Sequence, residues 1–109
     1  MLDHTQKAEQ MTGTVNQIEW ALRIKEQVRA EFDRVAKALK SVADKQPDHD
    51  REDTLAIIAI LEEKRAEVMS NTRAGYFIHD WQELSDQVRQ MIVQDPRYLV
   101  IKAKKATRR

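Results

Sequence analysis

Apolar side chains recur every three or four residues along most of this 109-residue chain, which is the spacing of one face of an α-helix. The clearest stretch follows Gly13, where Thr14 and Gln17 have the spacing of a capping box. Its seam has these positions: Ile18, Ala21, Lys25, Val28, Phe32, Val35, Leu39 and Val42. We predict a first helix that ends near Lys45. Lys25, the polar member, either extends its ammonium past apolar neighbours into water or fixes the register of a helix pair.

An uninterrupted apolar run, LAIIAIL at 55–61, predicts the second helix. Taken alone, such a run also fits a buried strand, but the helix-favouring flanks REDT and EEKRAE indicate a helix. Pro47 separates it from the first helix, and we expect Asp48 or Asp50 to cap it. We expect Asn71 or Gly75 to supply a left-handed cap after its end. A helix that is apolar on every side needs neighbours on every side.

The three-and-four spacing returns after residue 76 and predicts a third helix that ends before Asp95. Its apolar positions are Phe77, Trp81, Leu84, Val88 and Met91. Asp80 with Glu83 also matches an N-cap pair, so the alternative start is residue 80. The aromatic register favours the earlier start. The segment AGYFIHDW at 74–81 is rich in aromatic rings, which we interpret as core packing where two helices meet. A ligand or partner role for Tyr76 is the alternative.

Asp95 and Pro96 begin the last segment, with the aspartate expected as the cap and the proline as the first helical residue. Residues 98–101, YLVI, fit either a short strand or a helical turn. We expect a helical turn that leads into a disordered tail.

These elements predict an all-α fold, an antiparallel helical bundle of three long helices plus a short C-terminal helix. One domain is expected, with an N-terminal extension at 1–12, the bundle at 13–95, and a short helix and basic tail at 96–109. Because the second helix is apolar on every side, we expect a homodimer to complete the bundle. The predicted self-interface or partner interface consists of Leu55, Ile57, Ile58, Ile60, Leu61, Tyr76 and Trp81.

The composition limits the structural class and the cellular location of the protein more than it limits its function. Charged residues make up 34% of the chain, and it has only two glycines and two prolines. A chain with so few helix-breaking residues favours long helices with charged surfaces. The lack of cysteine excludes disulfides and thiolate metal sites. No apolar run reaches the roughly 18 residues of a membrane span, and the N-terminus MLDHTQKAEQ lacks the apolar core of a secretory signal. We expect a cytoplasmic protein that does not bind membranes.

Carboxylates on the second and third helices suggest a metal site. Oxygen ligands suit Mg²⁺, and antiparallel helices can bring such acids together. The candidate ligands are Glu63, Glu67, Glu83 and Asp86. The pattern resembles the MazG-type nucleotide pyrophosphohydrolases, all-helical proteins with an EExxE motif followed by ExxD. Glu83 and Asp86 match the second motif, but EEKRAE carries its third acid one position late. The resemblance implies a Mg²⁺-dependent nucleotide enzyme.

The C-terminal segment is basic and has no acidic residue after Asp95. Such segments bind phosphate backbones through counterion release, with strong salt dependence. The candidate nucleic-acid contacts are Lys102, Lys104, Lys105, Arg108 and Arg109. The alternative is a tail that only promotes solubility.

No complete set of catalytic residues or cofactor motif is recognisable, so we assign no catalytic residue and expect no cofactor. The leading hypothesis is a non-enzymatic helical interaction or regulatory protein that acts as a homodimer. A nucleic-acid-associated protein and the Mg²⁺-dependent enzyme are the alternatives.

Overall fold

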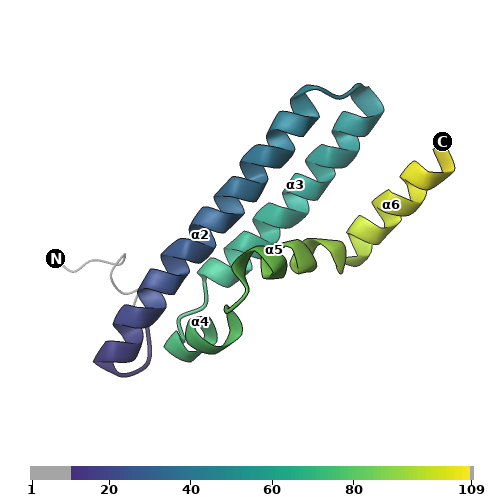
Figure 1. The fold of residues 1–109 in the computed structure, drawn as a ribbon. Coiled ribbons are helices and arrows are strands. Elements are labelled where there is room, and N and C mark those ends of the chain that lie inside the picture. The colour runs from purple at the N-terminus through teal and green to yellow at the C-terminus, as the bar shows by residue number, and fades with distance from the viewer. Residues whose placement is uncertain (1–10, 109) are drawn as a thin grey trace.

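The computed structural model describes residues 11–108 and is all-helical in that range (Figure 1). Its helices are α2 (Val15–Asp44), α3 (Asp48–Met69), α4 (Ala74–Asp80), α5 (Leu84–Val93) and α6 (Pro96–Arg108). The predicted all-α class is therefore confirmed. Within the described range no strand forms, although Thr12 and Arg73 pair through an isolated parallel bridge.

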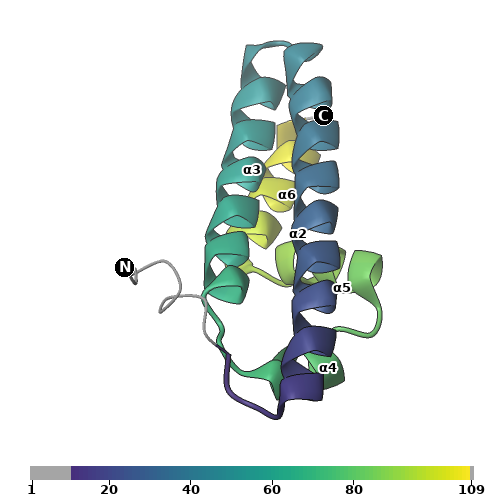
Figure 2. The same ribbon diagram turned by 90° about the vertical axis from the view of Figure 1, so that its left-hand side faces the viewer.

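Helices α2 and α3 form a long antiparallel hairpin that spans most of the molecule (Figures 1 and 2). The capping box at the start of α2 is confirmed, because the Thr14 hydroxyl accepts a hydrogen bond from the Gln17 backbone N–H and the Gln17 side chain accepts one from Thr14 N–H. Midway along the hairpin, Arg65 forms an ion pair with Asp33 at 2.5 Å. Helix α5 crosses the hairpin and α6 turns back along it (Figure 2).

The start of α3 differs from the prediction. Pro47 occupies the N-cap position, its carbonyl accepts the Arg51 N–H at 2.8 Å, and Asp48 is already the first helical residue. Proline suits this place because it has no N–H that would need a partner. Asp48 and Asp50 instead place negative charge in the first turn, where it complements the helix dipole.

The left-handed residue is Gly13, not Asn71 or Gly75. Helix α3 ends at Ser70 with ordinary right-handed geometry, Asn71 does not have a positive φ, and Gly75 lies inside α4. Gly13 has φ +146°, and a Cβ there would lie 3.1 Å from the Cβ of Ala74. The chain on either side of Gly13 is tied to the segment before α4, since Thr12 N–H donates to Thr72 O and Ala74 N–H donates to Thr12 O. Gly13 therefore permits a close backbone approach.

The predicted third long helix is broken into α4 and α5 at residues 81–83. Trp81 leaves helical geometry with ψ 64°, and its buried ring lies 6.2 Å from that of Phe32. The Gln87 side chain holds the break, because its amide donates to the Asp80 carbonyl and accepts the Glu83 N–H. The predicted continuous helix from residue 77 to 94 is therefore wrong, and so is the alternative start at residue 80.

The last segment is a regular helix throughout its described length. Asp95 accepts the Arg97 N–H at 2.8 Å, which confirms the predicted cap, and residues 98–101 are helical. The expected disordered tail is wrong for residues 102–108, which continue the helix. Arg109 lies outside the described residues, as do residues 1–10 of the predicted extension.

One end of the hairpin has a closed core, which we call the closed end and define by Met11, Lys25, Phe32, Phe77 and Trp81. Met11, although predicted in an extension, is buried there. The Lys25 side chain is only 9% exposed, and its ammonium lies 5.7 Å from the centre of the Phe77 ring. The aromatic residues that begin α4 thus serve core packing, as the sequence indicates.

No helix in the described part of the chain combines the length and the apolar character needed to cross a membrane.

Candidate binding groove beside helix α6

An open groove lies between α6 and the hairpin, and we call it the α6 groove. It consists of two neighbouring cavities of about 550 and 480 Å³. Ile57 of α3 and Tyr98 of α6 line both cavities, so the two adjoin each other. The lining residues are Arg34, Val35, Leu39, Ile57, Ser85, Asp86, Arg89, Ile92, Val93, Tyr98, Ile101, Lys102, Lys105 and Ala106.

The floor of the α6 groove is aliphatic and comes from four helices. Val35 and Leu39 extend the α2 seam past the closed end, and both are only half-buried. Ile92 and Val93 come from the end of α5, Ile57 from α3 and Ile101 from α6. Aliphatic side chains along an open groove are the surface that a helix or ligand covers in many complexes.

Basic side chains dominate the rim. Arg34 and Arg89 lie at the α5 end, and each is neutralised by an acid one helical turn away: Glu31 at 2.5 Å and Asp86 at 3.4 Å. Lys102 and Lys105 lie at the α6 end. Neither forms an ion pair with an acidic side chain within residues 11–108. The positive charge of the rim is therefore least compensated along α6.

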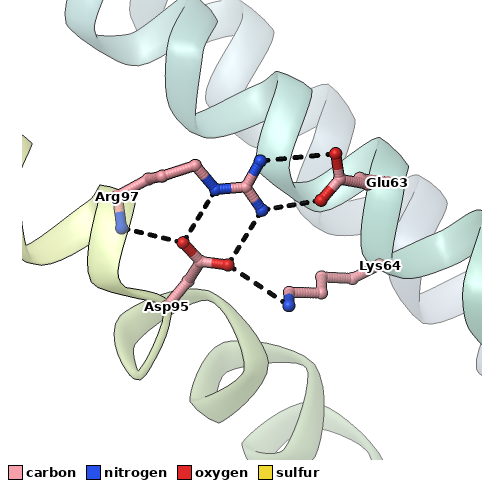
Figure 3. A network of polar contacts seen from close by, with 4 residues as sticks. All are labelled: Glu63, Lys64, Asp95 and Arg97. Carbon is pink, nitrogen blue, oxygen red and sulfur yellow. Dashed lines mark hydrogen bonds and ion pairs between the residues drawn. The ribbon is translucent and has the colours of Figure 1, made fainter.

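A polar network fixes α6 at the base of the α6 groove (Figure 3). Asp95 is 6% exposed and accepts hydrogen bonds from the Arg97 backbone N–H at 2.8 Å and from Arg97 Nε at 2.9 Å. The same guanidinium bridges to Glu63 on α3 at 2.6 Å, and Lys64 Nζ lies 3.2 Å from Asp95. Four charged groups from α3 and from the start of α6 thus form one connected cluster.

The network shifts the ionisation of its members. Hydrogen bonds from the Arg97 side chain, then from its backbone N–H, hold the pKa of Asp95 well below the usual range, and Lys64 acts in the same direction. Arg97 likewise lowers the pKa of Glu63 through a hydrogen bond to its carboxylate. The pKa of Arg97 rises, mainly through its hydrogen bonds to Asp95. All three groups are therefore held in their charged forms.

The predicted interface residues are dispersed by the fold. Ile60, Leu61 and Trp81 are buried within the chain itself, so packing inside one chain accounts for their apolar character. Leu55 is 45% exposed, and Tyr76 is half-buried with its ring at 5.0 Å from that of Phe77. Of the remaining members, Ile58 is half-buried and Ile57 lines the α6 groove.

The predicted nucleic-acid residues do not share one face of α6. Lys102 and Lys105 face the α6 groove, whereas Lys104 is exposed and is not part of its lining. At about 100° per residue, Lys104 lies about 100° around the helix from Lys105 and farther from Lys102. Arg108 ends the helix, but its side chain lies outside the described residues.

The predicted metal ligands also have separate environments. Glu63 is paired with Arg97, and Asp86 lies 3.4 Å from Arg89 on the rim of the α6 groove. Glu83 precedes α5 at the helix break, and Glu67 is exposed on α3. Within residues 11–108, no group of three or more carboxylate or histidine side chains has an arrangement that could hold a metal ion.

The chain was compared with protein-family models, with curated proteins and with solved structures, and no match was found in any of the three.

Sequence reasoning missed the α6 groove and the network at its base. The cap at Asp95 was visible, because an aspartate precedes a proline at the start of an apolar segment. The partners Glu63 and Lys64 lie more than thirty positions earlier, and no local pattern connects them to Arg97. If residues 102–108 are taken as a helix, Lys102 and Lys105 lie one turn apart on the same face and Lys104 lies on another face. The sequence would then have assigned these lysines to two different surfaces.

Proposed function

We propose that this chain is a non-enzymatic interaction module that receives a helical segment of a protein partner in the α6 groove. The observation that carries the proposal is the aliphatic floor to which α2, α3, α5 and α6 all contribute. Helix-in-groove recognition uses such a floor to bind side chains at positions i, i+3 or i+4, and i+7 of an amphipathic helix. The cytoplasmic setting remains a prediction.

Homodimerisation is a further proposal. The apolar run at 55–61 supports it in part, because packing within the chain already buries two of its residues: Ile60 is 3% exposed and Leu61 is fully buried. Leu55, together with the half-buried Ile57 and Ile58, remains available for a second copy. Light scattering over a hundredfold concentration range tests this directly. A persistent mass of two chains supports the dimer, and a single-chain mass throughout refutes it.

Site-specific photo-crosslinking in cells that naturally contain the protein tests the interaction module. The photoreactive amino acid benzoylphenylalanine replaces Ala106 or Leu39 in the α6 groove. The matched control replaces Ala30, which is exposed on α2 and does not line the groove. We expect one adduct of defined mass from both groove positions and none from position 30. An adduct with the mass of two copies identifies the partner as a second copy.

Competition with excess chain tests whether the crosslinking is specific to the groove. Excess unmodified chain should suppress the adduct, whereas excess Val93→Arg chain should not, because an arginine at this half-buried floor position obstructs the groove. Equal adducts from Ala30 and the groove positions, or no adduct from either groove position, would refute the proposal.

A further inference from the structure

The rim of the α6 groove specifies the chemistry of the partner. This step rests on the proposed function, since it assumes that the groove binds a helix. We infer that the partner segment is an acidic amphipathic helix, with aliphatic side chains on one face and glutamate or aspartate residues along the edge that meets α6.

The charges on the rim of the groove favour an acidic partner. Lys102 and Lys105 line the groove, and neither pairs with an acidic side chain in the described part of the chain. Lys105 is also half-buried, so part of its side chain lies against the groove wall. A carboxylate from a partner would pair with these two lysines, whereas a lysine or arginine of a partner would be repelled.

The two ends of the rim differ in how far their positive charges are compensated within the chain. Arg34 and Arg89 already have acids beside them, Glu31 and Asp86. Their charges are satisfied within the chain and add less to the attraction of a partner. The unsatisfied charge is therefore concentrated on α6, and the acidic residues of the partner are expected on the edge that lies against this helix.

The aliphatic floor of the groove favours a protein helix over a nucleic acid. A phosphate backbone gains from the lysines but nothing from an aliphatic floor such as Leu39, Ile57 and Val93. Single-stranded nucleic acids bind through aromatic rings on which bases stack, and the α6 groove offers Tyr98 alone. The combination of an aliphatic floor with a basic edge matches a helix that is apolar on one face and acidic on its flank.

Three labelled model helices test the inference by fluorescence anisotropy with the intact chain. They share one leucine pattern and differ only in their polar positions, which are glutamate, glutamine or lysine. We expect the glutamate helix to bind about tenfold more tightly than the glutamine helix at low salt, which corresponds to about 1.4 kcal/mol. The advantage should shrink at about 0.3 M salt, because screening weakens exposed ion pairs.

Charge reversal localises the effect. The double variant Lys102→Glu, Lys105→Glu should lose the preference for the glutamate helix. The matched control is Lys37→Glu, Lys40→Glu, which changes the net charge equally at two exposed lysines of α2 that do not line the groove. This control should keep the preference, and an equal loss in both variants would refute the inference because net charge alone would then explain it.

The remaining outcomes separate the two proposals. If the glutamine and glutamate helices bind equally and Val93→Arg abolishes both, the groove binds helices and only the acidic preference is wrong. If none of the three helices binds at about 1 mM, a concentration at which even weak complexes form, and the crosslinking is also negative, both proposals fail. A labelled oligonucleotide that binds more tightly than the glutamate helix, and loses binding in the Lys102→Glu, Lys105→Glu variant, would overturn the inference in favour of nucleic acid.

Discussion

The two halves of the α2–α3 hairpin are covered in different ways. At the closed end, Phe32, Phe77 and Trp81 are buried, and the chain before α2 is hydrogen-bonded to the segment before α4. Along the other half, α6 covers one side and leaves Val35, Leu39, Ile57 and Val93 of the α6 groove half-buried. The closed end thus holds the fold together, and the α6 groove is the part of the molecule with surface to offer a partner. This difference predicts that equivalent substitutions will have unequal effects in the two halves.

The largest expected effect is at the closed end. Phe77→Ala removes a fully buried ring that contacts Tyr76 and lies beneath the Lys25 ammonium. We expect a loss of about 3–5 kcal/mol in the free energy of unfolding, because the deletion leaves a cavity. Val93→Ala in the α6 groove is the comparison from the other half and should cost about 1 kcal/mol or less, since it removes a smaller group and its side chain is only half-buried. Urea denaturation measures both, and similar losses would contradict the distinction between the two halves.

The second effect concerns the backbone that closes this end. Gly13→Ala should destabilise the chain by about 1–3 kcal/mol, because φ +146° is strained for alanine. Its Cβ would also approach Ala74 to 3.1 Å. Gly75→Ala is the control, since it lies inside α4 and its Cβ would have an ordinary contact of 3.6 Å with His79. We expect this change to be neutral or to stabilise by up to about 1 kcal/mol. Thermal melts of the two variants should shift in opposite directions or leave Gly75→Ala unchanged.

The two halves also differ in how far the sequence predicts them. The hairpin follows from local signals, namely the capping box at Thr14, the apolar seam of α2 and the break at Pro47. The interruption at 81–83 escapes prediction because Trp81, Leu84 and Val88 keep three-and-four spacing across it. The spacing indicates which side chains face the core. It does not show whether the helix is continuous between them.

The α6 groove depends on contacts between distant segments. Its shape follows from the placement of α5 and α6, which is fixed by Gln87 at the helix break and by the pairing of Arg97 with Glu63. Neither contact has a signature in the local pattern, because glutamine and charged residues are common on exposed helix faces. Sequence reasoning identified Ile57, Lys102 and Lys105 among its candidates, but assigned them to separate hypotheses. The fold brings them together.

A third prediction tests the network that positions α6. Asp95→Asn keeps an N-cap side chain but removes the negative charge that Arg97 and Lys64 share. The pKa of Asp95 is lower in the folded chain than its ordinary value of about 3.9. The stabilisation from this carboxylate is therefore fully present above about pH 4 and is lost as the pH falls further towards the folded pKa.

Melting temperatures measured from pH 7 to pH 2.5 check this prediction. We expect Asp95→Asn to melt below the unmodified chain at pH 7, and the difference between the two to narrow below about pH 4. Asp86→Asn is the control, because this exposed carboxylate has a surface ion pair with Arg89 and its loss should change the melting temperature little. A difference for Asp95→Asn that stays constant down to pH 2.5 would show that its charge does not stabilise α6.

The smallest effect is expected on the outer face of α6. Val100 is 57% exposed, and its neighbour Ile101 is 9% exposed and lines the α6 groove. Val100→Gln should change the free energy of unfolding by no more than about 0.5 kcal/mol, because this side chain is largely exposed to water in both the folded and the unfolded chain. Ile101→Gln should cost clearly more, since it places an amide against the α3 side of the groove.

Comparison of Val100→Gln with Ile101→Gln also tests which face of α6 contacts the partner helix. Urea denaturation gives the stability of each variant, and binding of the glutamate model helix gives the state of the α6 groove. Val100→Gln is expected to leave both unchanged, whereas Ile101→Gln should weaken both, because the same side chain holds α6 in place and lines the groove. If Val100→Gln weakened helix binding while stability stayed constant, the partner would contact the outer face of α6, and the groove on its inner face would not be the binding site.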